Sequence, residues 1–377
     1  MNRNYTTDVA IVGGGVIGSA LAYFLRKAGV DVLVIERAEV AAESSSAAAG
    51  LLSPLGALEE NNAFTDLIMA SRALILKLMP ELETLSGASM EYRRCGSLRT
   101  ASETRDVARL REQMAVWETM GWQVNWLTGD EARQQEPHLA PTIQAAVYAS
   151  QEGSIKAAGV TRAYAGAARS LGARFLEHTE VTGIESAGER VLGLRTAAGE
   201  TINCARLVIA AGAWSTTIGY WLHLKIPVQP ARGQILALKQ PATPLKHILF
   251  GEQVYLIPKP DDTIFVGATV EQVGFEKQVT AAGISWLLAG AMKLAPVLAE
   301  APIERMWAGL RPWSADERPI LGDAPGWENV ILATGHSGVG FETSAISGQS
   351  LAELLTSGQT PAIIRPFGLE RFTAHSS

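Results

Sequence analysis

A glycine-rich turn between two short apolar runs is the feature that most constrains this chain. Val9–Val12 is expected to form a strand, and the glycine-rich stretch 13–18 follows it at the start of a helical pattern. Val32–Ile35 is expected to form a second strand, and Glu36 closes it. This order is typical of the opening βαβ unit of a dinucleotide-binding fold. A plain βαβ turn is the alternative.

Each glycine of the turn has a separate steric task in such a unit. Gly13 permits the tight turn, Gly15 lets the backbone approach a pyrophosphate, and Gly18 allows the helix to pack closely on the strand. The start of the helix offers free N–H groups and the positive end of its dipole to phosphates. Glu36 lies where an acid can bind the ribose hydroxyls. The unit therefore indicates that a bound cofactor carries out the difficult chemistry.

Composition excludes several classes of protein. The chain has 377 residues, enough for two domains, and its 47% hydrophobic and 19% charged residues are typical of globular proteins. A net charge of −6 without a basic cluster argues against nucleic acid and anionic membranes as partners. Cys95 and Cys204 lack the spacing of a disulfide framework or a metal site, so no metal is expected.

The apolar run near the N-terminus is interpreted as part of the fold. Arg3 precedes it, as in a signal peptide, but the run contains the glycine turn and leads into a second strand. It is also too short and too rich in glycine for a membrane span. We therefore expect a cytoplasmic protein.

Small residues fill the segment 41–51, directly after Glu36. Low complexity permits a flexible linker. Its place at the ligand side of the sheet favours close backbone approach to a large planar ligand. Downstream, a helix is expected over Phe64–Leu85 with a break at Pro80.

Later parts of the chain alternate between the two kinds of structure. Leu207–Gly212 and Val330–Thr334 are expected to return to the first sheet as buried strands, and a helix is expected over Thr343–Leu355. Between them, 226–311 predicts strands of an antiparallel sheet, with a hairpin turn at 259–262. A helix over Ala281–Leu298 interrupts those strands. No internal repeat is evident.

The predicted fold class is α/β with an added antiparallel β part. A discontinuous Rossmann-like cofactor domain carries an inserted substrate domain with a mixed or antiparallel sheet. The predicted boundaries are 1–85, 150–218 and 318–377 for the first domain, and 86–149 and 219–317 for the second.

An ordered set of motifs along nearly the whole chain resembles the flavin-dependent D-amino acid oxidase superfamily. The likeness is greatest to bacterial glycine oxidases of the thiamine-biosynthesis type. Beside the glycine turn and Glu36, its carriers are Ser46-Ala-Ala-Ala-Gly50, Glu177-His-Thr-Glu-Val181, Val208-Ile-Ala-Ala-Gly-Ala-Trp214, Pro230-Ala-Arg-Gly-Gln234, Val266-Gly-Ala-Thr269, Trp307-Ala-Gly-Leu-Arg-Pro312, Arg318-Pro-Ile-Leu-Gly322 and Gly335-His336. The Trp-Ala-Gly-Leu-Arg-Pro run is the most specific of them.

The resemblance implies FAD rather than NAD, held in a GR2-type domain, and it implies which residues lie along the cofactor. Backbone groups after the third strand would face the flavin N1–C2 carbonyl, where reduction places negative charge. The implied cofactor-binding residues are Gly13, Gly15, Val16, Ile17, Gly18, Glu36, Arg37, Ser44, Ser45, Ala49, Gly50, Leu51, Val181, Gly212, Trp214, His336, Ser337, Gly338, Val339, Gly340 and Phe341.

Arg311 and Tyr255 are the candidate catalytic residues. Oxidation of an amine α-carbon by hydride transfer to the flavin requires the substrate to be oriented, and no nucleophile–base pair is evident. A guanidinium can hold a carboxylate by two parallel bonds, so Arg311 is expected to bind a small anionic amine. In the family a tyrosine hydroxyl also meets the carboxylate, which implicates Tyr255. The alternatives are a surface arginine in an ion pair and a tyrosine packed on a sheet.

Three departures from the family pattern affect the pocket and the cofactor. Gly338 stands where glycine oxidases often carry a second arginine, and Val270 stands where they often carry a methionine. The pocket is therefore either larger, admitting N-substituted glycines or D-amino acids, or still selective for glycine. Near Arg311 the chain lacks the cysteine that tethers flavin in the sarcosine oxidase branch, which predicts non-covalent FAD.

Four functional hypotheses follow. The first is an amine oxidase that uses oxygen, and the second is a dehydrogenase that passes electrons to a quinone or a protein. The third is a non-catalytic flavin subunit of a complex. The fourth is an NAD-dependent dehydrogenase, which would purify colourless where a flavoprotein is yellow. Homo-oligomers are expected only because relatives form them.

Overall fold

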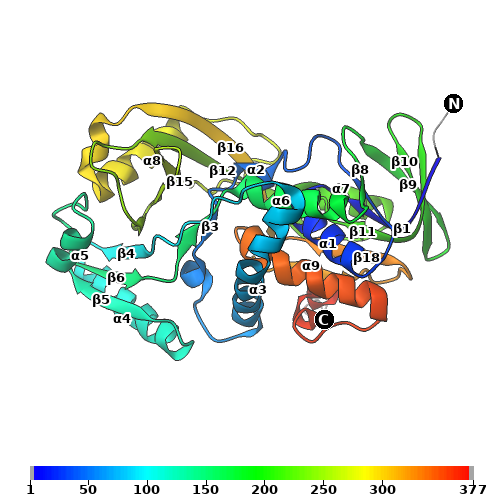
Figure 1. Ribbon diagram of the computed structural model, residues 1–377, viewed down its shortest axis with the longest axis horizontal. Coiled ribbons are helices and arrows are strands. Elements are labelled where there is room, and N and C mark those ends of the chain that lie inside the picture. Colours follow the sequence, from blue (N-terminus) through cyan, green and yellow to red (C-terminus); the bar gives the residue numbers. More distant parts are fainter. Residues whose placement is uncertain (1–3, 373–377) are drawn as a thin grey trace.

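The computed structural model describes residues 4–372, so the predicted domain ends at 1–3 and 373–377 lie outside the described residues. Two lobes lie side by side along the long axis, and each is built around an eight-stranded sheet (Figure 1). The first sheet takes strands from the start, the middle and the end of the chain, and the second takes strands from the stretches between them. This is the discontinuous α/β architecture that the sequence predicts.

The first sheet has the order β17-β18-β11-β1-β2-β8, in which β18 to β8 are parallel and β17 is antiparallel to β18, and the antiparallel strands β10 and β9 extend it beside β11. Strands β2 and β18 are buried along their whole length, which explains their unbroken apolar runs. The strands are β1 (Asn4–Val12), β2 (Val32–Ile35), β8 (Arg174–Leu176), β9 (Val181–Ala187), β10 (Arg190–Thr196), β11 (Thr201–Ile209), β17 (Ile320–Asp323) and β18 (Val330–Thr334).

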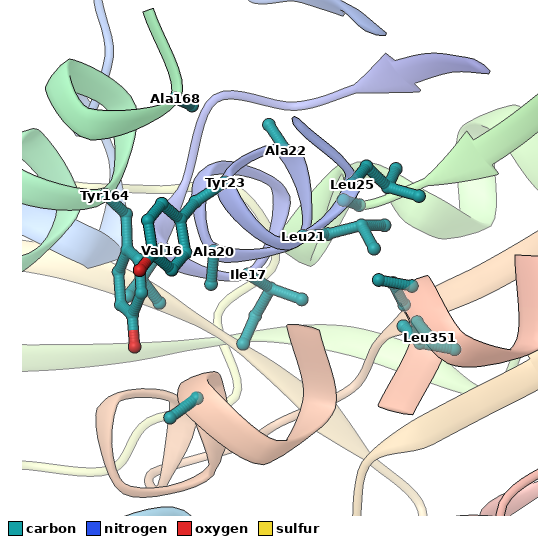
Figure 2. Close-up of a cluster of buried hydrophobic side chains, with 14 of the residues drawn as sticks. Val16, Ile17, Ala20, Leu21, Ala22, Tyr23, Leu25, Tyr164, Ala168 and Leu351 are labelled. Carbon is teal, nitrogen blue, oxygen red and sulfur yellow. The ribbon is translucent and has the colours of Figure 1, made fainter. Parts of the chain in front are cut away.

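Helices cover both faces of this sheet. Helix α1 lies between α6, which contributes Tyr164 and Ala168, and α9, which contributes Leu351 (Figure 2). A Cβ on Gly348 would lie 2.9 Å from the backbone of Ala20, so α9 crosses α1 at close range. The opposite face is covered in part by α7. The helices are α1 (Val16–Lys27), α3 (Ala63–Ser86), α6 (Ala157–Ser170), α7 (Ser215–Trp221) and α9 (Gly340–Ser357).

Two helix predictions in this lobe are wrong in detail. Helix α3 continues through Pro80 without a break. Proline costs a helix about 3 kcal/mol, but each buried leucine returns about 1.5–3 kcal/mol, and Leu78 and Leu82 are buried beside α6 and α9. Helix α9 begins at Gly340 rather than Thr343, which places the residues after the glycine turn in its first turn.

The second sheet is mixed, in the order β16-β12-β15-β14-β13-β4-β6-β5. Its pairs are antiparallel except for β13 with β4. The predicted hairpin at 259–262 is confirmed, since it joins β14 to β15 and Lys259 N–H donates to the Thr263 carbonyl at 2.8 Å. The strands are β4 (Ser97–Ala101), β5 (Val124–Thr128), β6 (Ala145–Ala149), β12 (Val228–Lys239), β13 (Ile248–Phe250), β14 (Tyr255–Pro258), β15 (Thr263–Gly267) and β16 (Ile303–Ser314).

Three helices pack on the second sheet: α4 (Thr104–Thr119), α5 (Gly129–Gln135) and α8 (Ala281–Leu294). The prediction that α8 reaches Leu298 is wrong. Pro296 disfavours helical backbone at the residue before it, and Ala295 is extended, so a 3₁₀ turn, η3 (Pro296–Glu300), follows instead.

The small-residue segment 41–51 is ordered at the junction of the lobes and is not a linker. It contains the short helix α2 (Ser44–Ala47) and enters β3 (Leu51–Leu52), which pairs with β7 (Gly153–Ser154). The remaining 3₁₀ turns are η1 (Pro54–Ala57), η2 (Gly212–Trp214), η4 (Arg365–Phe367) and η5 (Leu369–Phe372). Over residues 4–372, no helix has the length and apolar character to cross a membrane.

Candidate active site

A cavity of about 730 Å³ runs along the edge where the parallel strands end and faces the second sheet. Residues that follow β1, β2, β11 and β18 line one part of it, as expected for a ligand at the carboxyl ends of parallel strands. Strands β12, β14 and β16 line the other part. The cavity therefore joins the two lobes, and we describe it as a cofactor end, at the strand ends, and a substrate end, at the second sheet.

Two glycines of the turn at the cofactor end, Gly13 and Gly18, cannot accommodate side chains. Gly13 has φ +115°, and a Cβ there would lie 2.3 Å from the Ala210 carbonyl oxygen. A Cβ on Gly18 would lie 2.1 Å from the Gly13 oxygen, so Gly18 packs the helix against the turn and does not line the cavity. Gly15 caps α1 without a side-chain bond and leaves its first turn open to the cavity.

Polar groups around the turn suit a phosphate and ribose site. The Glu36 carboxylate accepts N–H bonds from Gly14 at 2.7 Å and from Ala38 at 2.9 Å, and its remaining lone pairs can accept further bonds. The Ser45 hydroxyl accepts the Val16 N–H at 3.0 Å, at the start of α1.

The motif at 307–311 links the small-residue segment to the second sheet. Trp307 Nε1 donates to the Ala47 carbonyl at 2.9 Å, and a Cβ on Gly309 would lie 2.5 Å from the Ala47 Cβ. Alternate residues of a strand share a face, so Arg311 follows them on the same side of β16. Strand β16 thus packs against the segment 41–51 and also carries Arg311.

Lys259 fixes the same segment from the hairpin. Its Nζ donates to the carbonyls of Ala49 at 2.6 Å and Ile155 at 3.3 Å. Burial lowers the pKa of Lys259 to about 8. The ammonium borders a second cavity of about 360 Å³, on the other side of Ala48 and Ala49 from the first.

The turn after β18 contributes backbone rather than charge. His336 is buried, its Nε2 lies 3.3 Å from the Ser347 hydroxyl, and burial lowers its pKa to about 3. The imidazole is therefore neutral near pH 7. Gly338 lines the cavity, and a Cβ there would meet no atom within 4 Å, so a side chain could begin at this position without a clash.

Arg311 lies across the neighbouring strand at the substrate end. A Cβ on Gly233 would lie 2.3 Å from Nη1 of Arg311, so only glycine leaves room for the guanidinium. Nη1 donates to the Thr269 carbonyl at 3.0 Å, and no carboxylate of residues 4–372 forms an ion pair with it. Burial lowers its pKa. A desolvated guanidinium without an acidic partner is a site for an anionic ligand.

Tyr255 lies beside Arg311 in the same manner. A Cβ on Gly267 would lie 2.5 Å from the Tyr255 hydroxyl, so the ring also crosses a glycine of the adjacent strand. Burial raises the pKa of Tyr255 to about 12, and the nearby Arg311 charge opposes that shift. The hydroxyl stays protonated and can donate to an anion that Arg311 holds.

The predicted site residues converge, with one exception. All of them line the cavity except Gly18, whose place behind the turn matches its expected packing role. Arg37 lies at the cofactor end, where its guanidinium stacks 3.6 Å from the Trp214 ring centroid and pairs with Glu43 at 3.0 Å. Val270, which stands where the family often carries a methionine, lines the cavity and is 55% exposed.

Sequence reasoning missed two residues, Lys259 and Glu342. Lys259 is part of the predicted hairpin turn, which gave no reason to place it at the cavity. Glu342 lies in the first turn of α9 and lines the cavity, with an oxygen that accepts the Ser53 N–H at 2.8 Å. Glu342 closely follows the glycine-rich turn 335–340, and this spacing is the sequence signal that indicates an acid at the cavity.

The cofactor end fits FAD. A pyrophosphate needs exposed N–H groups without nearby Cβ atoms, a ribose needs an acid, and a flat ring needs walls of small residues. Gly13 and Gly15, Glu36 and the segment 44–51 supply these features around one cavity. Neither Cys95 nor Cys204 lines the cavity, and burial raises the pKa of both thiols.

Among residues 4–372, no group of three or more His, Cys, Asp or Glu side chains is placed to hold a metal ion. Both cysteines are free.

Comparison with known proteins identifies close likenesses. A family described as "FAD dependent oxidoreductase" matches residues 8–354. The glycine oxidase of Geobacillus kaustophilus is 33% identical over 97% of both chains. Its crystal structure superposes with a TM-score of 0.92 at 32% identity, over 97% of this chain and 99% of that one. These findings confirm the resemblance and the fold class that the sequence predicts.

Two other relatives differ in length or assembly. The "Bifunctional protein ThiO/ThiG" of Nostoc sp. is 34% identical over 99% of this chain, but the chain spans only 56% of its length. The "Hydrogen cyanide synthase subunit HcnC" of Pseudomonas aeruginosa is 31% identical over 99% of this chain and 97% of its own.

Proposed function

Because this chain belongs to the family of FAD-dependent oxidoreductases, we propose that it oxidises a small amino acid or secondary amine. The candidate substrates are glycine, sarcosine, related N-substituted glycines and D-amino acids. FAD is the cofactor of the family, and when bound it supplies a hydride acceptor at its N5 atom. The protein's residues then have to bind the substrate, orient its α-carbon and exclude water.

One observation carries the proposal: Arg311 is a desolvated guanidinium without an acidic partner among the described residues, and it lies in the cavity that contains the glycine turn. A buried cation without a counterion is costly, so an anionic ligand stabilises it. The substrate class that satisfies it carries a carboxylate. The glycine oxidase relatives support the same class.

Two side chains would fix the carboxylate. Arg311 would hold it by parallel N–H bonds, which set both distance and tilt. The protonated Tyr255 hydroxyl would donate a further bond from the adjacent strand. An anchored carboxylate restricts where the amine-bearing carbon lies relative to the cofactor end, which is the orientation that hydride transfer needs.

FAD would be held without a covalent bond. The exposed start of α1 would face the pyrophosphate, Glu36 would accept bonds from a ribose, and the segment 44–51 would lie along the flavin. Backbone N–H groups of residues 336–341 and the positive end of α9 would stabilise negative charge on reduced flavin. Neutral His336 would add no charge there.

Oxygen is the proposed electron acceptor. The second candidate is a dehydrogenase that passes electrons to a quinone or a protein, or a flavin subunit of a complex. The relative named as a hydrogen cyanide synthase subunit favours keeping that candidate. A cytoplasmic location, a homo-oligomeric state and a role in thiamine biosynthesis belong to the same proposal.

Anaerobic flavin reduction tests the proposal. The purified protein should be yellow and should bleach with at least one of glycine, sarcosine, D-alanine, D-proline or a bulkier N-alkylglycine. Peroxide formed on admitting air would identify an oxidase, and bleaching without peroxide would identify a dehydrogenase. A yellow protein that none of these amines bleaches would contradict the proposed oxidation.

A further inference from the structure

Glu342 is a buried acid that lines the cavity of the proposed active site. It lies in the first turn of α9, is 7% exposed and lines the cavity together with Arg311 and Tyr255. One oxygen accepts the Ser53 N–H at 2.8 Å, and this is the bond that orients the side chain. The position in the first turn favours a negative charge, because the helix dipole is positive there.

Glu342 differs from the other acids of the cavity in its partners. Glu43 pairs with Arg37 at 3.0 Å and with Lys277 at 2.8 Å. Glu36 accepts two backbone N–H bonds, and Glu180 is exposed. Within the described part of the chain, Glu342 forms no ion pair with a lysine or arginine. It is thus the buried acid of this cavity whose charge lacks a direct counterion.

Three charged groups act on Glu342, from β4, from α3 and from the segment between β6 and β7, and none of them forms an ion pair with it. Arg99 on β4 is engaged by Glu152 at 3.0 Å. A Cβ on Gly56 would lie 3.3 Å from Nη1 of Arg99, so that pair sits directly behind the turn that follows Ser53. Arg72 on α3 bonds the Gln151 carbonyl. Burial, and then the Glu152 charge, raises the pKa of Glu342 to about 7 against the opposing Ser53 bond and the two arginines.

Among the described residues, the cavity therefore carries one cation and one buried acid that lack an ion-pair partner, the complement of an amino acid zwitterion. We propose that Glu342 binds the substrate amine while Arg311 holds the carboxylate, and that Glu342 takes the ammonium proton before oxidation. The inference rests on the proposed function and narrows it to substrates that carry both a carboxylate and a protonated amine.

The proton transfer balances simply. The ammonium N–H bond breaks, its proton bonds to a carboxylate oxygen of Glu342, and the nitrogen keeps its electron pair. Glu342 becomes neutral, and the amine becomes neutral. Bound FAD would supply the two-electron oxidant for the cleavage of the α C–H bond, and the nitrogen lone pair would form the C=N bond of the product. Only a neutral amine has the lone pair that this step needs.

A structural role for Glu342, holding the Ser53 N–H alone, is the competing explanation. Glu342→Gln separates the two, because an amide oxygen still accepts that N–H but neither carries charge nor takes a proton. Glu353→Gln is the matched control, since Glu353 is an exposed residue of the same helix. Flavin content and the visible spectrum should be unchanged in both variants.

Binding of two unreactive acids provides a readout separate from turnover. 2-Methylalanine has an amine but no α-hydrogen, so it cannot be oxidised, and 2,2-dimethylpropanoate has the same shape without the amine. Each is titrated against the flavin absorbance of the loaded protein. Glu342→Gln should weaken 2-methylalanine about tenfold or more and leave 2,2-dimethylpropanoate within about twofold. Glu353→Gln should change neither.

The wild type provides a second measurement that does not depend on the variant folding. Its preference for 2-methylalanine over 2,2-dimethylpropanoate should rise as pH increases through about 7, the pKa of Glu342. The pH dependence of anaerobic reduction by a reactive amine should show the same breakpoint, and Glu342→Gln should lose it.

The outcomes separate this inference from the proposed function. If an amine reduces the flavin but Glu342→Gln leaves the affinity ratio of the two acids and the pH profile unchanged, only the role assigned to Glu342 is wrong. If the affinity ratio of the two acids depends on Glu342 but no amine reduces the flavin, the proposed oxidation is wrong and the amine-binding role of Glu342 stands. If neither acid perturbs the flavin spectrum, both proposals are wrong.

Discussion

The two ends of the cavity are built in different ways. The cofactor end consists mainly of backbone: Gly13 and Gly15 carry no side chain, and the first turns of α1 and α9 line the cavity. The substrate end consists of side chains from the second sheet, where Arg311 and Tyr255 each cross a glycine of the adjacent strand. A cofactor common to many enzymes can be bound by backbone groups, whereas a particular substrate is bound by polar and charged side chains at specific positions.

The largest expected effect is at the glycine turn. Gly13→Val should abolish flavin binding, because a side chain would clash with the Ala210 carbonyl and is strained at φ +115°. Strain and overpacking together cost roughly 2–6 kcal/mol. Flavin-to-protein absorbance and the melting temperature measure the change. Gly29→Ala is the control, since Gly29 has φ +79° in open space and should keep its flavin. A yellow Gly13→Val protein would show that the turn is not the cofactor site.

Arg311→Ala should have the next largest effect, confined to the substrate end. Loss of the guanidinium should weaken carboxylate substrates by roughly 3–5 kcal/mol and leave flavin content intact. Arg311→Lys should recover only part of the loss, because it lacks the fork of parallel donors. Anaerobic flavin reduction at several substrate concentrations measures both variants. Full recovery by lysine would contradict the bidentate geometry.

The raised pKa of Glu342 predicts that the free energy of unfolding depends on pH in the wild type more than in Glu342→Gln. Its pKa of about 7 in the folded protein exceeds the ordinary 4.5, so the folded state binds more protons between these values. Its contribution to stability is therefore greatest below 4.5 and declines as pH rises toward 7, by at most about 3 kcal/mol. Glu342→Gln should gain melting temperature relative to wild type at about pH 8 and lose that advantage at about pH 4.5. Parallel melting curves would show that Glu342 titrates normally.

Gly338→Arg should have the smallest effect and should alter only selectivity. A Cβ at this position would meet no atom within 4 Å, so a side chain can begin there without a clash, and an arginine adds a cation to the cavity. We expect the ratio of kcat/KM for glycine to that for a bulky N-alkylglycine to rise about tenfold. Gly338→Ala serves as the control for backbone effects. An unchanged ratio in Gly338→Arg would mean that this opening does not limit substrate size.

The sequence predicts the cofactor end better than the substrate end, and the reason is physical. A glycine turn, a helix and an acid lie within one short segment, so their spacing is visible along the chain. Arg311 and Tyr255 were found only through resemblance to a family. Lys259 and Glu342 depend on contacts with Ala49 and Ser53, which lie 210 and 289 residues away in the chain. Such contacts exist only once both sheets have formed.

Local propensity also failed where tertiary packing dominates. Pro80 predicts a break in α3, but buried leucines keep this helix continuous. The sequence also predicts that α9 begins at Thr343, three residues after its start at Gly340. That second error concealed Glu342, because the residue was not expected in the first turn of a helix facing the cavity.

The central claim is that one cavity holds FAD by backbone at one end and a substrate carboxylate by Arg311 at the other. The direct test compares anaerobic flavin reduction by sarcosine with reduction by dimethylamine, which is sarcosine without its carboxylate. If sarcosine is a substrate, it should reduce the flavin about a hundredfold faster than dimethylamine; any other amino acid that bleaches the protein is compared with its own decarboxylated amine. Equal rates for the two amines, or a protein that purifies without flavin, would contradict the claim.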